Sequence, residues 1–147
     1  MFKNILVPTD GSLLSQENSR RAVTFAKETG ARITAFFAKP GYPVTYYGEG
    51  ALIDPTSPEK FAELAEQQSH ENLAFIAQLA QENGVPCDTV SLTSDVPWEA
   101  IIEAATRHHC DLIFMASHGR RGISGLLLGS ETNKVLTHSK IPVLVYR

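Results

Sequence analysis

Short apolar runs alternate along the chain with longer segments in which apolar residues recur every three or four positions. Runs of the first kind predict buried strands, and the second pattern predicts helices with one buried face. The predicted strands cover residues 3–8, 32–38, 87–93, 111–116 and 141–146. The predicted helices cover residues 15–29, 59–83, 97–109 and about 130–138.

Turn and cap residues support several of these boundaries. Gly30 and Gly84 stand where the first two helices need a residue in the left-handed conformation. Pro97 suits the first turn of the third helix, for which Asp95 is the expected N-cap. Residues 39–58 interrupt the alternation with repeated Pro and Gly, and we expect a loop there. Such a long loop is either an ordered surface excursion or a functional lid or interaction segment.

Strands that alternate with helices predict an α/β fold. Right-handed crossovers then give a five-stranded parallel open sheet in the order 3-2-1-4-5, with helices on both faces. The unbroken apolar run at residues 111–116 fits a strand that is covered on both sides. The length of 147 residues fits one domain, spanning residues 1–147.

Composition narrows the class of protein further. The net charge of −3 gives no electrostatic reason to expect a nucleic acid or an anionic membrane as a partner. No apolar run approaches the roughly 20 residues of a membrane span, and no signal-peptide pattern opens the chain. We therefore expect a cytoplasmic protein. The two cysteines, Cys87 and Cys110, fit no metal-ligand spacing and are expected to be reduced thiols.

Two loops that leave predicted strand ends carry candidate binding residues. One is residues 8–12, Pro-Thr-Asp-Gly-Ser, and the other is residues 116–130, which is rich in Gly. In the expected strand order both loops reach the crevice where the winding of the sheet reverses, the usual ligand position in such folds. Glycines let backbone N–H groups approach an anion, and Gly129-Ser130 opens a helix whose N-terminus favours negative charge.

Several readings of these residues stay open or are excluded. Asp10 either binds a ligand or caps the turn that follows it, and Ser130 either caps its helix or donates to a phosphate. Neither a GxxxxGK[ST] nor a GxGxxG motif is present. Ser117 and His118 are adjacent and expected to point apart, which argues against a catalytic pair. His108-His109 lacks the spacing of a helical metal site, so no metal site of the protein's own is expected.

The motifs Ile5-Leu-Val-Pro-Thr-Asp-Gly-Ser12 and Ser117-His-Gly119, then nine residues and Gly129-Ser130, resemble the universal stress protein family. The closing Ile141-Pro-Val-Leu-Val145 is similar to that family's last strand. The resemblance extends over essentially the whole chain. It implies an adenine nucleotide alpha hydrolase-like fold and binding of ATP, AMP or ADP, with Mg²⁺ carried by the phosphates.

The same resemblance assigns site residues. Asp10 and its neighbours would contact the adenosine, Ala38 and Met115 would line the adenine pocket, and the glycine loop would hold the ribose and phosphates. The implied nucleotide-binding set is Pro8, Thr9, Asp10, Ala38, Met115, Ala116, Ser117, His118, Gly119, Arg120, Gly122, Gly129, Ser130 and Glu131. Ala116 departs from the family's motif, which has its first glycine there. A methyl group is harmless at a negative φ and crowds the ribose otherwise.

The last predicted strand lies at a sheet edge, and bare apolar edges are usually covered or paired. The family's similar strand pairs across a two-fold axis, which implies a homodimer through Pro142, Val143, Leu144 and Val145. No nucleophile with a paired base is evident, so we expect a regulatory binding module in the stress response with at most slow ATP hydrolysis. The alternative is a nucleotide-free interaction protein of the same fold.

Overall fold

The computed structural model describes residues 1–47, 50–53, 57–119 and 128–147. The helices in these residues are α1 (Leu13–Thr29), α2 (Pro58–Glu82), α3 (Pro97–Arg107) and α4 (Ser130–His138). The strands are β1 (Asn4–Pro8), β2 (Arg32–Lys39), β3 (Val44–Tyr47), β4 (Gly50–Ile53), β5 (Cys87–Thr93), β6 (Leu112–Ala116) and β7 (Val143–Tyr146).

The main sheet is parallel, and its strands follow the order β5-β2-β1-β6-β7. In terms of the five predicted strands this order is 3-2-1-4-5, so the predicted fold class is confirmed. Strand β1 lies in the middle, paired with β2 on one side and with β6 on the other. The winding reverses between these neighbours, which places a crevice at the carboxyl ends of β1 and β6.

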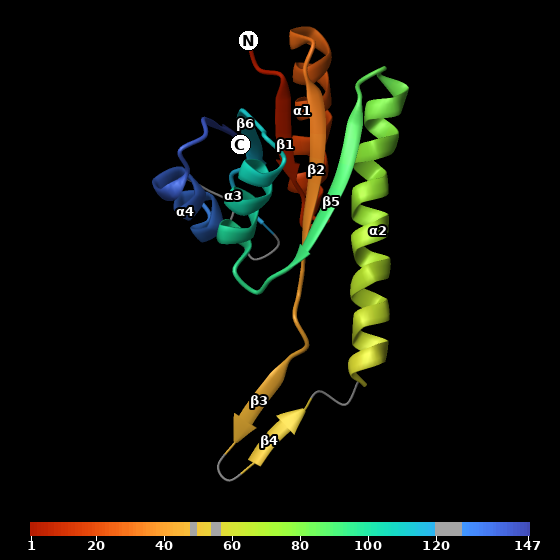
Figure 1. The fold of residues 1–147 in the computed structure, drawn as a ribbon, viewed down its shortest axis with the longest axis vertical. Helices are drawn as coiled ribbons and strands as arrows, with labels where there is room; N and C mark the ends of the chain where they lie inside the picture. The colour runs from red at the N-terminus through yellow and green to blue at the C-terminus, as the bar shows by residue number, and fades with distance from the viewer. Residues whose placement is uncertain (48–49, 54–56, 120–127) are drawn as a thin grey trace.

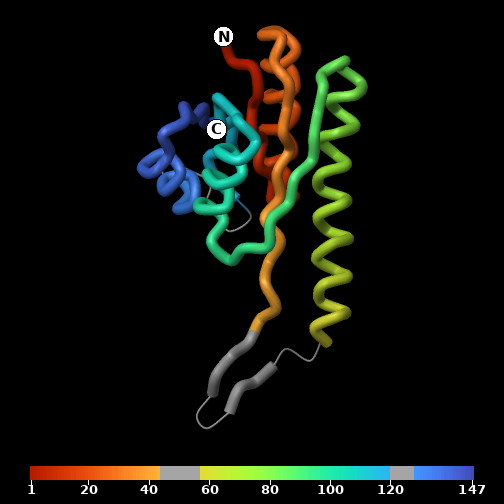
Figure 2. Tube along the Cα trace, viewed as in Figure 1, coloured from red at the N-terminus to blue at the C-terminus, as the bar shows by residue number. Residues whose placement is uncertain are grey.

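Helices cover both faces of the sheet. Alternate residues of a strand point to opposite faces, so they pack in two separate hydrophobic cores. On one face Ile5 and Val7 of β1 pack with residues of α1 and α2. On the other face Leu6 packs with residues of α3 and α4. Figure 1 shows α3 and α4 together on one side of the sheet, with α2 on the other. Figure 2 follows the chain through α2 and β5, which lie side by side.

The sequence predicted a loop at residues 39–58, but part of this segment forms strands. Strands β3 and β4 form an antiparallel pair in which Val44 lies opposite Ile53. They make a two-stranded sheet of their own, separate from the main sheet. Each strand has four residues between positions rich in Pro and Gly, too short for the sequence pattern to register.

The expected N-cap of α3 was also wrong. The N-cap residue is Val96, which offers no side-chain oxygen, and no side-chain cap bond is made there. The Asp95 carboxylate is engaged elsewhere, since its Oδ1 accepts a hydrogen bond from the Gly41 N–H at 3.0 Å. This bond ties the crossover that leads into α3 to the chain leaving β2. The remaining helix and strand boundaries differ from the predicted ones by no more than two residues.

Candidate functional site

The loop after β1 is held by its own side chains. Gly11 has a φ of 79°, a left-handed conformation that glycine adopts without strain. Asp10 Oδ1 accepts a hydrogen bond from Ser12 N–H at 2.9 Å, and the Thr9 and Ser15 hydroxyls are 2.6 Å apart. Ser12 in turn caps α1 by accepting from Ser15 N–H. Asp10 therefore does cap the following turn, with one of its two carboxylate oxygens.

The loop after β6 returns to the point where it leaves the sheet. Ser117 O accepts a hydrogen bond from Gly129 N–H at 2.8 Å, and the Thr132 hydroxyl donates to Ala116 O at 2.9 Å. A Cβ on Gly129 would lie only 3.0 Å from Ser117 O, so the close approach of the two backbones favours glycine. These bonds fix the start of α4 against the carboxyl end of β6.

The two loops meet at Gly119. A Cβ placed on that residue would lie 2.6 Å from Asp10 Oδ2, well inside van der Waals contact. A glycine at this position is therefore what lets the second oxygen of Asp10 sit against the β6 loop. The contact joins the carboxyl ends of β1 and β6, where the strand order predicts the ligand crevice.

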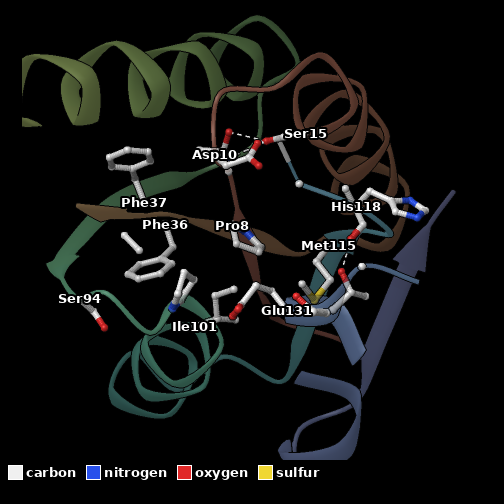
Figure 3. A pocket seen from close by; sticks show the side chains of 18 of the residues that line it. Pro8, Asp10, Ser15, Phe36, Phe37, Ser94, Ile101, Met115, His118 and Glu131 are labelled. Atoms are coloured by element: carbon white, nitrogen blue, oxygen red, sulfur yellow. Dashed lines mark hydrogen bonds between the residues drawn. The ribbon is translucent and has the colours of Figure 1, made fainter. Parts of the chain in front are cut away.

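A cavity of about 560 Å³ lies at this edge of the sheet, a volume within the usual range for small-molecule sites. Figure 3 shows side chains from several elements turned toward it. Part of its wall is apolar, and a polar part is formed by the β1 loop and the start of α4. The lining comprises Pro8, Thr9, Asp10, Ser15, Phe36, Phe37, Ala38, Pro40, Ser94, Asp95, Pro97, Ile101, Met115, Ala116, His118, Gly119, Gly129, Ser130, Glu131 and Thr132.

Most of the predicted site residues come together in this lining. Ser117 does not belong to it, because the residue is only 2% exposed. Arg120 and Gly122 lie outside the described residues, so their positions remain sequence-based expectations. The part that each of these residues plays in ligand binding also stays a prediction.

The expectation that Ser117 and His118 point apart was wrong. Ser117 Oγ and His118 Nδ1 are 2.9 Å apart and share a hydrogen bond, so the neighbouring side chains turn toward each other. The arrangement does not present a nucleophile to the cavity, since the serine is buried while the histidine forms part of the wall. The pair fixes the conformation of the loop.

Backbone geometry bears on two alternatives that the sequence left open. Ala116 ends β6 opposite Tyr146 and does not have a positive φ, so its methyl group causes no backbone strain. Ser130 is the first residue of α4, and Gly129 is the N-cap, with no side-chain cap bond. The N-cap residue of α4 thus supplies no side-chain acceptor to the first amides of the helix, and Gly129, Ser130 and Glu131 all belong to the cavity wall.

Sequence reasoning placed Ala38 of β2 at the site but missed the other residues of that strand and the crossover into α3. Phe36 and Phe37 come from the carboxyl half of β2, whereas Ser94, Asp95 and Pro97 follow β5. The strand order itself was the available signal, because all parallel strands bring their carboxyl ends to one edge. Among the described residues of the lining the acidic side chains are those of Asp10, Asp95 and Glu131, and His118 adds an imidazole.

Two further observations concern metal sites and membrane spans. In the part of the chain that the structure describes, no three His, Cys, Asp or Glu side chains are placed to hold a metal ion. Nor does any helix in those residues combine the length and apolar character needed to cross a membrane.

Fold and cavity together define an open parallel α/β protein with a ligand cavity at the carboxyl edge of its sheet. The chain belongs to the universal stress protein family, whose model matches residues 1–147. It is 34% identical to "Universal stress protein MJ0531" of Methanocaldococcus jannaschii, over 100% of this chain and 83% of that protein.

Solved structures share the fold over nearly the whole chain. A universal stress protein in complex with cAMP has a TM-score of 0.72 at 22% identity, covering 99% of this chain and 97% of that one. The universal stress protein from Archaeoglobus fulgidus in complex with dAMP has a TM-score of 0.70 at 18% identity, covering 99% of this chain and 98% of that one.

Proposed function

We propose that this protein binds an adenine nucleotide in the cavity at the carboxyl edge of its sheet and acts as a regulatory module in the stress response. The observation that carries the proposal is the junction of the β1 and β6 loops at Gly119 and Asp10, beside the start of α4, whose N-cap residue is Gly129. The complexes of two proteins of the same fold with cAMP and dAMP support the choice of an adenine nucleotide.

Each part of the nucleotide would meet matching chemistry. Ala38 and Met115 line the apolar part of the cavity, where a flat purine would displace water at little polar cost. Asp10 would accept hydrogen bonds from ribose hydroxyls through the oxygen that faces Gly119. The phosphates would lie at the first turn of α4, where backbone N–H groups and the helix dipole favour an anion.

ATP is the ligand proposed in particular, with Mg²⁺ coordinated by its phosphates, as is usual in nucleotide sites. We expect stoichiometric binding with negligible turnover, because Ser117 is buried and bonded to its neighbour. Turnover of many molecules per second would contradict this expectation.

Mass spectrometry of the denatured, purified protein tests the proposal directly. Co-purifying AMP, ADP or ATP, or a rise in Tm when these nucleotides are added, is the expected result. The variant Asp10→Ala should lose the ligand-induced shift in Tm. It should also lose about 1 kcal/mol of unfolding free energy, because Ser12 N–H loses its acceptor.

The matched control is Glu28→Ala, which removes an exposed carboxylate at the far end of α1 and should keep the ligand-induced shift. Absence of co-purified nucleotide together with no shift in Tm would refute nucleotide binding. That result would favour the alternative of a nucleotide-free interaction protein.

We further propose that the protein acts in the cytoplasm as a homodimer that pairs through β7. This strand ends the described sheet, and its Val143, Leu144 and Val145 are only partly buried. A two-fold pairing of this edge would cover those side chains and satisfy the outward backbone groups.

A further inference from the structure

A side chain of another helix, α4, caps the start of α3. Its own N-cap residue, Val96, has no oxygen to offer, and Asp95 is bonded to Gly41. The Trp98 N–H in the first turn instead donates to Glu131 Oε2 of α4 at 2.9 Å. A carboxylate at this place satisfies an otherwise orphan amide and interacts favourably with the helix dipole.

The same carboxylate belongs to the wall of the ligand cavity. Glu131 is the second residue of α4, is half-buried, and appears among the lining side chains in Figure 3. Its backbone lies in the turn of α4 that would receive phosphates, while its side chain reaches the first turn of α3. One helix N-terminus at the cavity is therefore already occupied by a fixed negative charge, and the other lies directly beside that charge.

Fixed charge of this kind has different consequences for different nucleotides. An uncharged nucleoside does not interact with it strongly, whereas each added phosphate is repelled by it. The repulsion weakens with salt, with distance and with any cation that neutralises the phosphates. Because the hydrogen bond to Trp98 N–H restrains the carboxylate, moving it away from a ligand would leave that amide unpaired.

We propose that Glu131 is a specificity-determining residue that lowers the affinity for the nucleoside triphosphate relative to the monophosphate. The inference rests on the proposed function, since it concerns the charge of the nucleotide in that same cavity. Asp10 and Asp95 add negative charge to the described lining, but each binds a backbone N–H on another part of the wall. Mg²⁺ bound to the triphosphate reduces the penalty and makes ATP binding depend on the metal.

The test compares dissociation constants for adenosine, AMP and ATP by calorimetry, at low salt with EDTA and again with Mg²⁺. The key variant is Glu131→Gln, which removes the charge and keeps an oxygen for the Trp98 N–H. We expect affinity for ATP to rise about three- to tenfold relative to AMP, with adenosine unchanged. Salt and Mg²⁺ should each reduce this gain.

The control is Glu99→Gln, which removes an exposed carboxylate from the first turn of α3 without touching the lining. It should leave the ATP to AMP ratio unchanged. Equal changes for all three ligands in Glu131→Gln, or an unchanged ratio, would overturn the inference while nucleotide binding stood. If the wild-type protein bound none of the three ligands, the proposed function itself would fail.

Discussion

At the scale of single residues, the cavity depends on how closely two backbones approach. Gly119 allows the Asp10 carboxylate to sit against the β6 loop, and Gly129 allows α4 to start against Ser117. Ala116 departs from the family's glycine motif, yet it lies within regular strand geometry. Its methyl group therefore adds no backbone strain to the cavity wall, and we expect it not to weaken nucleotide binding.

Restoring the motif glycine tests this interpretation. In Ala116→Gly we expect the affinity for ATP to change by no more than about twofold, because a strand residue gains nothing from access to positive φ. The free energy of unfolding should fall by about 0.5–1 kcal/mol, because glycine loses more backbone entropy on folding. Calorimetry and urea unfolding measure the two effects. An affinity gain above tenfold would show instead that the methyl group crowds the ligand.

The two free thiols give a prediction on pH. Burial raises the pKa of Cys87 and of Cys110 above the ordinary thiol value. Alkylation by iodoacetamide near neutral pH should therefore be slow in the folded protein and fast in urea, because the thiolate is the nucleophile. A raised pKa in the folded state also means that keeping the thiols protonated contributes to the free energy of unfolding. This contribution is fully present below the unfolded thiol pKa of roughly 8.5 and is lost as the pH rises above that value.

Rapid alkylation of either cysteine in the folded protein would contradict the burial. Substitution of both residues by Ala should flatten the alkaline loss of stability measured by urea unfolding between neutral and alkaline pH.

At the scale of helices and strands, sequence periodicity predicted the elements that carry long apolar patterns. The five strands of the main sheet and the four helices could be placed because each repeats its pattern over several residues. Strands β3 and β4 were missed since four residues are too few for such a pattern. The cap of α3 was missed for another reason. The Glu131 carboxylate that accepts from Trp98 N–H is far away in the sequence, so only tertiary structure brings the two together.

The β3–β4 pair offers a test at this scale. Replacing residues 44–53 with a Gly/Ser segment of equal length removes the hairpin and keeps the reach of the connection. We expect the Tm to change by no more than a few degrees and nucleotide affinity to be unchanged, because β3 and β4 form a two-stranded sheet separate from the main sheet that carries the cavity. Circular dichroism melting and calorimetry measure both.

A large loss of stability after this replacement would mean that the hairpin supports the main sheet. Unchanged binding combined with loss of a cellular phenotype would identify residues 44–53 as the interaction segment considered from the sequence.

At the scale of the whole molecule, the strand order could be predicted because crossover handedness leaves few topologies for such a chain. The location of the cavity followed from that order, whereas its full wall did not. Side chains from β2 and from the crossover into α3 reach it through packing that no local pattern records. The same order leaves β7 at one end of the described sheet, paired on one side with β6.

A single proline substitution tests whether two protomers pair through the outward edge of β7. Ile113 N–H donates to Pro142 O and Ser117 N–H donates to Tyr146 O, so the even-numbered residues of this segment face β6. By alternation, Val143 and Val145 present their backbone groups to the open edge. Val145→Pro removes an outward donor and spares the bonds to β6, so the proposed dimer should weaken markedly.

Light scattering should then give a mass near the 16.1 kDa of one chain for Val145→Pro, against twice that mass for the wild type. The control Val145→Thr keeps the N–H and should remain dimeric. A wild-type protein that is monomeric at micromolar concentration would contradict pairing through β7.

The bond from Gly129 N–H to Ser117 O joins the two ends of the connection between β6 and α4. Because this bond holds the two ends together, lengthening the connection should cost mainly loop-closure entropy, which is about 0.6 kcal/mol for a doubling of its length. Insertions or randomised sequences at residues 120–127 should thus leave the hydrogen bond from Gly129 N–H to Ser117 O in place. This stretch is accordingly a suitable position for building new ligand preferences into the scaffold by directed evolution.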